Sequence, residues 1–200
     1  VTASQNGDAN YNPASPVTRS FTISKANQSI TFGSLSNKTY GDADFTVTAT
    51  ATSGLPVSFG VGSGDKCTVA GNLVHITGGG SCTVTARQAG NENYFPADDI
   101  PQIFTIAKGT VSIIVEGLNQ TYDGNPKHVT VTTTPPVETV TVNYEGVDGT
   151  IYLKSTTPPT EKGRYTVTIE VNDPNYSGSA TATLIISDPK KFVYLPLVIR

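Results

Sequence analysis

The sequence predicts an all-β protein built of tandem antiparallel two-sheet sandwiches, and three observations carry this prediction. Apolar and polar residues alternate with a period of two in several segments, as they do in strands that bury one face. Turn sequences such as "SGLP", "AGN" and "TPP" separate these segments. Related stretches recur 82 or 83 residues apart, which indicates a repeat array. Short strands with regular turns over that length are typical of one sandwich in each repeat.

The first 25 residues are expected to be the C-terminal fragment of a preceding repeat. Shifted by 83 positions, residues 1–25 align without a gap to residues 84–108, and 13 of the 25 positions are identical. The loop "GDANYNPA" at 7–14 returns as "GNENYFPA" at 90–97. Because a single hairpin is only marginally stable in water, we expect this fragment to be mobile, to lie on a neighbouring repeat, or to pair with the open edge of another chain.

A complete repeat is predicted over residues 26–108. Its segments "FTVTATA" at 45–51 and "SCTVTARQ" at 81–88 both alternate apolar with polar residues. The residues predicted to point inward are Phe45, Val47, Ala49, Ala51, Cys82, Val84 and Ala86. The other face of each strand is rich in Thr, a β-branched residue that suits an exposed strand surface.

A second complete repeat is predicted over residues 109–187, and residues 188–200 form a tail without a counterpart. The motif "NKTYGD" returns as "NQTYDG" and "NENY" returns as "DPNY", in both cases 82 positions later. The segments "RYTVTIEV" and "ATATLII" alternate in the same way as those of the first repeat. Their predicted inward residues are Tyr165, Val167, Ile169, Val171, Ala180, Ala182, Leu184 and Ile186.

The connections between repeats are predicted to be very short. At "ISKANQSI" (23–30) and "IAKGTVSI" (106–113), the last strand of one repeat runs almost directly into the first strand of the next. Short connections limit the angles between neighbours, so they favour an extended, semi-rigid rod over a flexible string.

Five tyrosines are predicted to have structural roles. Tyr94 and Tyr176 occupy equivalent positions, as do Tyr40 and Tyr122, and a residue kept through diverged copies is more easily explained by packing or turn formation than by one ligand site. Tyr165 lies in "EKGRYTV", which resembles the approach to strand F of immunoglobulin-like domains. There a Tyr hydroxyl bonds to upstream backbone; the alternative is that Tyr165 only packs.

The longer motifs resemble known repeat families. "SITFGSLSNKTYGDADFTVTATATSGLPVSF" and "CTVAGNLVHITGGGSCTVTARQAGNENY" resemble bacterial immunoglobulin-like repeats. "NQTYDGNPKHVTV" and "EKGRYTVTIEVNDPNYSG" resemble the MBG (mostly β, glycine-rich) or YDG type of repeat from large bacterial surface proteins. The resemblance covers almost all of residues 1–187. It implies a secreted or surface-anchored, adhesin-like protein in which the repeats serve as a stalk without catalytic residues.

The two cysteines, Cys67 and Cys82, are 15 residues apart within the first repeat. Strand alternation points both side chains into the sandwich, so a disulfide fits, and the family resemblance implies the same pair. Closing such a loop stabilises a domain by about 3 kcal/mol in the chain-entropy model. A disulfide would also place the protein outside the cytoplasm. The alternative is two buried free thiols.

Composition and motifs argue against several functions. The formal net charge is −3, so the chain lacks the basic surface that nucleic acid requires. No apolar run approaches the roughly 18–20 residues of a membrane span. His75 and His128 are the only histidines, and neither has metal-pair spacing. No Gly-x-Ser-x-Gly elbow or phosphate-binding loop occurs. We therefore expect no catalytic site, no cofactor and no metal.

Acidic residues in turns raise the question of calcium, which takes several oxygen ligands from one site. These residues are Asp42, Asp44, Asp98, Asp99 and Asp123. No loop shows the repeated acid spacing of a dedicated calcium motif, so solvated turn carboxylates are the favoured interpretation.

We interpret the chain as a non-catalytic spacer or stalk module of an exported bacterial surface protein, located outside the cell or on its surface. Its partners would be the neighbouring repeats of the same chain. The alternative is a module that binds a surface glycan or a partner protein. The candidate ligand-facing residues for that alternative are Tyr144 and Tyr152, which have no repeated counterpart.

Overall fold

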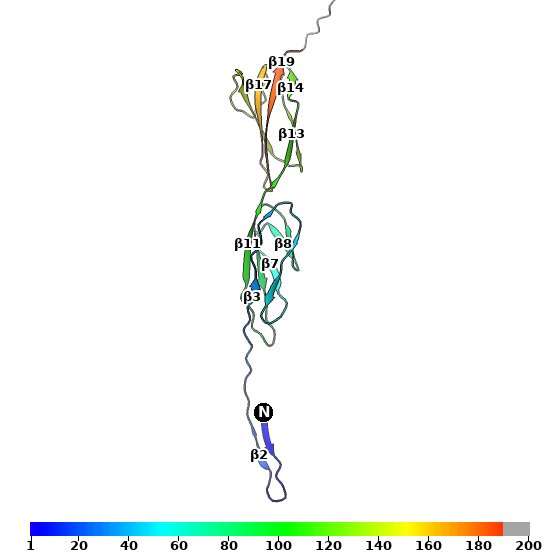
Figure 1. The fold of residues 1–200 in the computed structure, drawn as a ribbon. Coiled ribbons are helices and arrows are strands. Elements are labelled where there is room, and N and C mark those ends of the chain that lie inside the picture. Colours follow the sequence, from blue (N-terminus) through cyan, green and yellow to red (C-terminus); the bar gives the residue numbers. More distant parts are fainter. Residues whose placement is uncertain (190–200) are drawn as a thin grey trace, which may run out of the picture. The chain divides into compact units, whose positions relative to one another are not determined.

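The computed structural model describes residues 1–189, and every regular element in this range is a β-strand (Figure 1). Within the described range, no helix is long and apolar enough to cross a membrane. Residues 190–200, which make up most of the predicted tail, lie outside the described residues. The predicted all-β class is therefore confirmed for the part of the chain that the structure describes.

The chain divides into two compact units. The first consists of Val1–Gly33, Thr48–Gly60 and Thr85–Pro101, and the second of Ser34–Val47, Val61–Val84 and the chain from Gln102 onward. The division runs through the predicted repeat at 26–108, whereas the predicted boundary after Lys108 lies inside the second unit. The repeat boundaries themselves stay a prediction from sequence.

The N-terminal segment forms a hairpin of β1 (Thr2–Gln5) and β2 (Ala14–Thr18). The strands are antiparallel, with Thr2 opposite Thr18 and Gln5 opposite Ala14, and a register shift lies between Ala3 and Gln5. Every side chain on both strands is exposed. The hairpin is therefore a strand pair without a covered face.

Nine strands follow before residue 108: β3 (Ile30–Phe32), β4 (Lys38–Thr39), β5 (Phe45–Thr46), β6 (Ala49–Ala51), β7 (Ser58–Val61), β8 (Cys67–Ala70), β9 (Leu73–Ile76), β10 (Gly80–Arg87) and β11 (Ile100–Ala107). They form sheets of order β4-β11-β10-β7, β5-β9-β8 and β3-β6. On β10, Cys82, Val84 and Ala86 are buried as predicted.

The predicted single strand at 45–51 is instead two strands in different sheets. β5 pairs with β9, while β6 pairs with β3. Val47 between them is buried, and its N–H donates to the carbonyl of Asn72. The residues predicted to point inward still do so, because the change of sheet between β5 and β6 does not shift the alternation of side chains.

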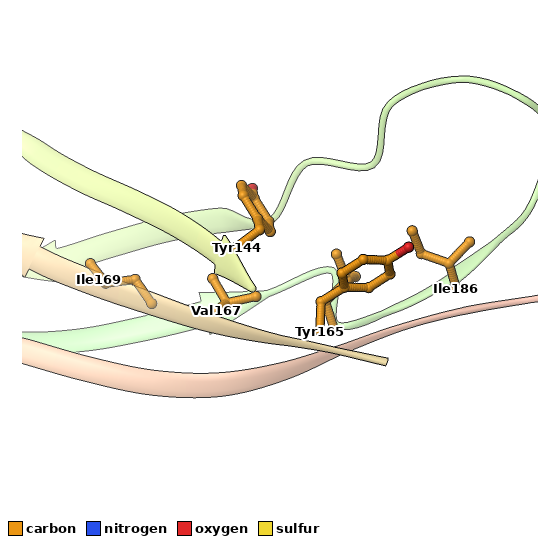
Figure 2. Packing of buried hydrophobic residues seen from close by; sticks show 6 residues of the cluster. Tyr144, Tyr165, Val167, Ile169 and Ile186 are labelled. Atoms are coloured by element: carbon orange, nitrogen blue, oxygen red, sulfur yellow. The ribbon is translucent and has the colours of Figure 1, made fainter. Parts of the chain in front are cut away.

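The second predicted repeat contains β12 (Gly109–Thr110), β13 (Ser112–Glu116), β14 (Asn119–Thr121), β15 (Thr130–Thr134), β16 (Val140–Val147), β17 (Gly163–Val171), β18 (Tyr176–Ser177) and β19 (Ser179–Ser187). The main sheet has the order β14-β19-β17-β16, and β13 pairs with β15 in another. Its core contains Tyr144, Tyr165, Val167, Ile169, Leu184 and Ile186 (Figure 2). Side chains of β13 and β15 pack against this core, so the two sheets form a sandwich.

One topological feature is the same in both predicted repeats. β4 pairs in parallel with the end of β11, and β14 pairs in parallel with the end of β19. A short early strand thus lies beside the last strand in each repeat. β12 also pairs in parallel with β18. The pairs β8–β9, β13–β15, β16–β17 and β17–β19 are antiparallel. The chain has the predicted fold class: immunoglobulin-like β-sandwiches preceded by a hairpin.

Candidate inter-repeat junction

One hydrogen-bonded loop occurs three times along the chain. In each copy a side-chain oxygen accepts hydrogen bonds from the backbone N–H groups two and three residues later, at 2.8–3.0 Å. The acceptors are Asp8, Asn91 and Asp173, and the second donor in each loop is Tyr11, Tyr94 or Tyr176. Asn and Asp favour such turns because their short side chains mimic a backbone acceptor.

The chain that enters the second repeat runs beside the third loop. β12 pairs in parallel with β18, with Gly109 opposite Tyr176. The N–H of Gly109 donates to the carbonyl of Asn175 at 2.9 Å. These bonds fix the connecting segment onto the loop of the repeat that it begins.

Tyr40 covers this loop from the first predicted repeat. Its ring centroid lies 5.2 Å from that of Tyr176, with an angle of 80° between the ring planes. Such edge-to-face pairs contribute about 0.5–1.5 kcal/mol beyond the burial of their area. Tyr40 follows directly after β4, and its own N–H donates to the carbonyl of Ala107, so its backbone is held against the last strand.

Two hydrogen bonds reinforce the contact. The N–H of Gly79 donates to Oδ1 of Asn175 at 3.0 Å, and Nζ of Lys108 donates to the carbonyl of Asp173 at 2.6 Å. Each hydrogen bond contributes about 0.5–3 kcal/mol to the stability of the contact. A charged donor reaches the upper part of this range only where it is desolvated. Lys108 is exposed, so its bond counts as a modest term.

Gly109 lies where a side chain would not fit. It is buried, and a Cβ there would stand 2.8 Å from the Tyr40 carbonyl oxygen and 3.0 Å from the Tyr176 ring. Carbon atoms do not approach so closely without displacing their neighbours. We call this set of contacts, made by Tyr40, Gly79, Lys108, Gly109 and the loop Asp173–Tyr176, the junction. All of it lies within the second compact unit.

Comparison with known protein families finds one match, in the C-terminal part of the chain. Residues 111–190 match the MBG domain. This stretch is thus similar to the MBG domain over most of the second predicted repeat, and we call residues 111–190 the MBG domain below. No curated protein matches the chain.

The chain is also similar to two solved structures of immunoglobulin domains. The four N-terminal Ig domains of Dscam1 isoform 4.44 share 19% identity with this chain at a TM-score of 0.39, covering 78% of this chain and 46% of that one. Immunoglobulin domains 1–5 of Sidekick-1 share 11% identity at a TM-score of 0.31, covering 81% of this chain and 39% of that one. This chain therefore spans less than half the length of either structure.

The MBG domain contains the predicted tyrosine corner. The hydroxyl of Tyr165 donates to the carbonyl of Glu161 at 2.7 Å, and its ring lies edge-on to Tyr152. Burial raises the pKa of the Tyr165 hydroxyl, and the nearby charge of Glu161 adds to the effect. The side chain therefore both fills the core, as Figure 2 shows, and ties β17 to the turn before it.

The remaining predicted structural tyrosines take different places. Tyr94 lies beside Ala26 through a parallel bridge. Tyr122 of the MBG domain packs against the core, and Nζ of Lys162 lies 5.7 Å from its ring centroid. The sequence predicted a role in packing or turn formation for both Tyr40 and Tyr176, but it did not predict that they contact each other. The constant offset between the "TY" and "NY" motifs was the available signal.

Cys67 and Cys82 form a disulfide, so the alternative of two free thiols is wrong. Cys67 lies on β8 and Cys82 on β10, which belong to different sheets. Both side chains are buried. At the position equivalent to Cys82, 83 residues later, the MBG domain has Tyr165. The two sandwiches therefore fill the same core position by different chemistry.

The expectation that Tyr144 faces a ligand is wrong. Tyr144 is only 3% exposed and belongs to the core of the MBG domain (Figure 2), and its hydroxyl accepts a hydrogen bond from the N–H of Val129. Tyr152 is half-buried, and its hydroxyl donates to the carbonyl of Thr157. Both rings therefore have partners inside the domain. The glycan-binding alternative has no open tyrosine at the two positions where the sequence placed it.

The predicted polar candidates lie apart from one another. His75 is paired with Asp44 on the surface at 2.6 Å, and Asp99 is paired with Arg87 at 2.8 Å. The Lys127 ammonium hydrogen-bonds Asp123 and holds the pKa of that carboxyl below its usual range. Among the described residues, no three His, Cys, Asp or Glu side chains gather in a way that could hold a metal ion.

Proposed function

We propose that this chain is a non-catalytic spacer of an exported bacterial surface protein, whose repeats hold another part of that protein away from the cell. The junction is the observation that carries the proposal. A ring pair, two hydrogen bonds and a closely packed glycine join the end of one repeat to the start of the next. A linker that served only to connect would need none of these contacts.

The parallel pairing of β4 with β11 and of β14 with β19 supports a load-bearing role. Bonds of this patch run from Tyr122 N–H to the Ser187 carbonyl and from Ile185 N–H to the Leu118 carbonyl, each at 2.8 Å. Tension between the two ends of a repeat acts along these parallel strands. These hydrogen bonds are then loaded together in shear. A spacer held in this way resists unfolding under tension better than one whose hydrogen bonds break one at a time.

The disulfide supports the location. Disulfides persist in oxidising compartments and are rare in the cytosol. Cys67 and Cys82 are joined within a sandwich whose stability depends on a small core. The pairing is compatible with an extracellular protein and suits a stalk that is exposed to the medium.

The proposal is tested by the motion of the two repeats. In the unchanged chain we expect amide nitrogen relaxation to give one rotational correlation time for residues 30–107 and 111–187. In a Tyr40→Ala/Lys108→Ala variant the ring pair and one hydrogen bond are lost, so we expect two shorter and different correlation times.

Tyr11→Ala is the control. Tyr11 lies in the same type of loop as Tyr176, the ring partner of Tyr40, but its side chain is exposed. The substitution should leave the relaxation of both repeats unchanged. Two separate correlation times in the unchanged chain would contradict the proposal, since the junction would then not hold the repeats together.

A further inference from the structure

The junction has a counterpart at the start of the first repeat. Lys25, Ala26, Asn93 and Tyr94 correspond, 83 or 82 positions earlier, to Lys108, Gly109, Asn175 and Tyr176. The local geometry is also the same. The N–H of Ala26 donates to the Asn93 carbonyl at 2.8 Å, as Gly109 does to Asn175, and Ala26 lies opposite Tyr94 in a parallel bridge.

The two surfaces differ in what covers them. At the junction, Gly109 is buried and Asn175 is half-buried beneath Tyr40 and the glycine turn at 78–80. At the earlier surface, Ala26 and Asn93 are exposed. An open hollow lies here, lined by Ile23, Ser24, Lys25, Ala26, Glu92, Asn93 and Tyr94. The same loop and linker are thus closed in one place and open in the other.

The segment that joins the hairpin to this surface is not covered by any other part of residues 1–189. Phe21 and Ile23 are 72% and 83% exposed, whereas the equivalent Phe104 and Ile106 are 2% and 3% exposed. Large apolar side chains with the alternation of a core strand are suited to a sandwich interior. In the first repeat, residues 26–83 provide the strands that bury residues of the segment 84–108. Residues 1–25 have no such strands in the described chain.

We propose that the surface formed by residues 23–26 and 92–94 docks the end of a preceding repeat, the one whose last two strands are residues 1–25. The partner would present a turn tyrosine equivalent to Tyr40 against the ring of Tyr94. A glycine-turn N–H equivalent to that of Gly79 would donate to the side chain of Asn93. The proposal takes from the proposed function only that the repeats are in tandem.

Two side chains of this surface limit how closely the partner can approach. Ala26 carries a methyl group where Gly109 has none, and Glu92 replaces Pro174. At the junction, a Cβ on residue 109 would meet the Tyr40 backbone. The docked turn must therefore stand farther from Ala26 than Tyr40 stands from Gly109, so the Tyr94 contact should be looser than the Tyr176 contact.

The experiment supplies the partner from this chain. A copy of residues 26–83 placed directly before Val1 gives residues 1–25 the strands that residues 84–108 have in the first repeat. We expect the amides of β1 and β2 to become protected from hydrogen exchange. We also expect ring-current shifts at Tyr94 and shifted signals of the Asn93 side-chain amide, whose oxygen would accept the new hydrogen bond, both absent in the unextended chain.

The matched variant carries Tyr40→Ala in the added copy alone. It should keep the protection of β1 and β2 but lose the shift at Tyr94. The proposal is overturned if the added segment does not fold onto the hairpin, or if it folds and Tyr94 and Asn93 do not respond. Concentration-dependent shifts of Tyr94 in the unextended chain would also overturn it, because the occupant would then be a second copy. Hydrogen exchange and chemical shifts test the docking proposal, whereas rotational correlation times test the spacer function. The two proposals can therefore fail separately.

Discussion

Residues 1–25 and residues 84–108 are related peptides, identical at 13 of 25 positions, in two environments. In both, an Asp or Asn side chain closes the loop, and a glycine precedes it in the left-handed region, with φ of 72° at Gly7 and 77° at Gly90. Their strands differ in burial, although the loop residues 91–93 are exposed like their counterparts. Almost every residue of the first segment is exposed, whereas the second supplies core residues from β10 and β11.

The comparison separates local from tertiary causes. The loop forms in both places because its bonds join residues within four positions of each other and need no other strand. Burial needs facing strands, which residues 26–83 provide for one copy only. Equivalent substitutions in the two segments should therefore have unequal effects, and the difference should be largest for a buried ring and smallest for a loop side chain.

Phe104→Ala should destabilise its sandwich by about 3–5 kcal/mol, because it removes a buried ring and leaves a cavity. Phe104 lies edge-on to Phe45, with ring centroids 5.6 Å apart. Phe21→Ala should change the free energy of unfolding by no more than about 0.5 kcal/mol, as expected of an exposed position. Urea unfolding followed through the amide signals of β10 and β17 measures both. Equal effects would mean that the hairpin is already part of a core.

Gly90→Ala should destabilise by about 1–3 kcal/mol, the usual cost of a strained backbone conformation. A Cβ at Gly90 would collide with the Tyr94 carbonyl, and the same collision with the Tyr11 carbonyl would occur at Gly7. Gly7→Ala should open the first loop and speed hydrogen exchange in β1 and β2. It should leave the unfolding transition of the sandwiches unchanged. A shift of that transition by Gly7→Ala would show that the hairpin contributes to their stability.

Asn91→Ala should cost about 1 kcal/mol, since two exposed hydrogen bonds to backbone N–H groups are lost and water replaces them in part. Asp8→Ala removes the equivalent bonds from the hairpin and should not change global stability. Thermal unfolding monitored by circular dichroism measures both variants. Asn91→Asp is the control, because Asp173 makes the same bonds in the MBG domain. A loss in Asn91→Asp as large as in Asn91→Ala would contradict this account of the loop.

Much of the sandwich could be predicted from particular residues. The alternation in "SCTVTARQ" and "RYTVTIEV" placed Cys82, Val84, Tyr165 and Val167 inward, and all four are buried. The resemblance of "EKGRYTV" to the approach to strand F suggested the bond of the Tyr165 hydroxyl to upstream backbone, but the sequence left open that Tyr165 only packs. The break between β5 and β6 did not follow, because alternation keeps its phase across a change of sheet.

The candidate site could be predicted only in part. Tyr40 and Tyr176 were identified as structural from their repetition, but the contact between them joins residues far apart in sequence. Tyr144 was misplaced because a residue that occurs in one repeat only was taken to be free of the core. Diverged repeats fill equivalent positions with different side chains, so a core residue need not recur.

The sequence by itself determined the repeat period, the inward faces of the strands and the three Asp or Asn loops. These depend on side-chain alternation and on hydrogen bonds between near neighbours in the chain. Only the tertiary structure decided which of the matching segments are buried and which tyrosines meet at the junction. Those outcomes depend on strands and turns brought together from distant parts of the chain, and two related peptides have different surroundings when only one has such partners.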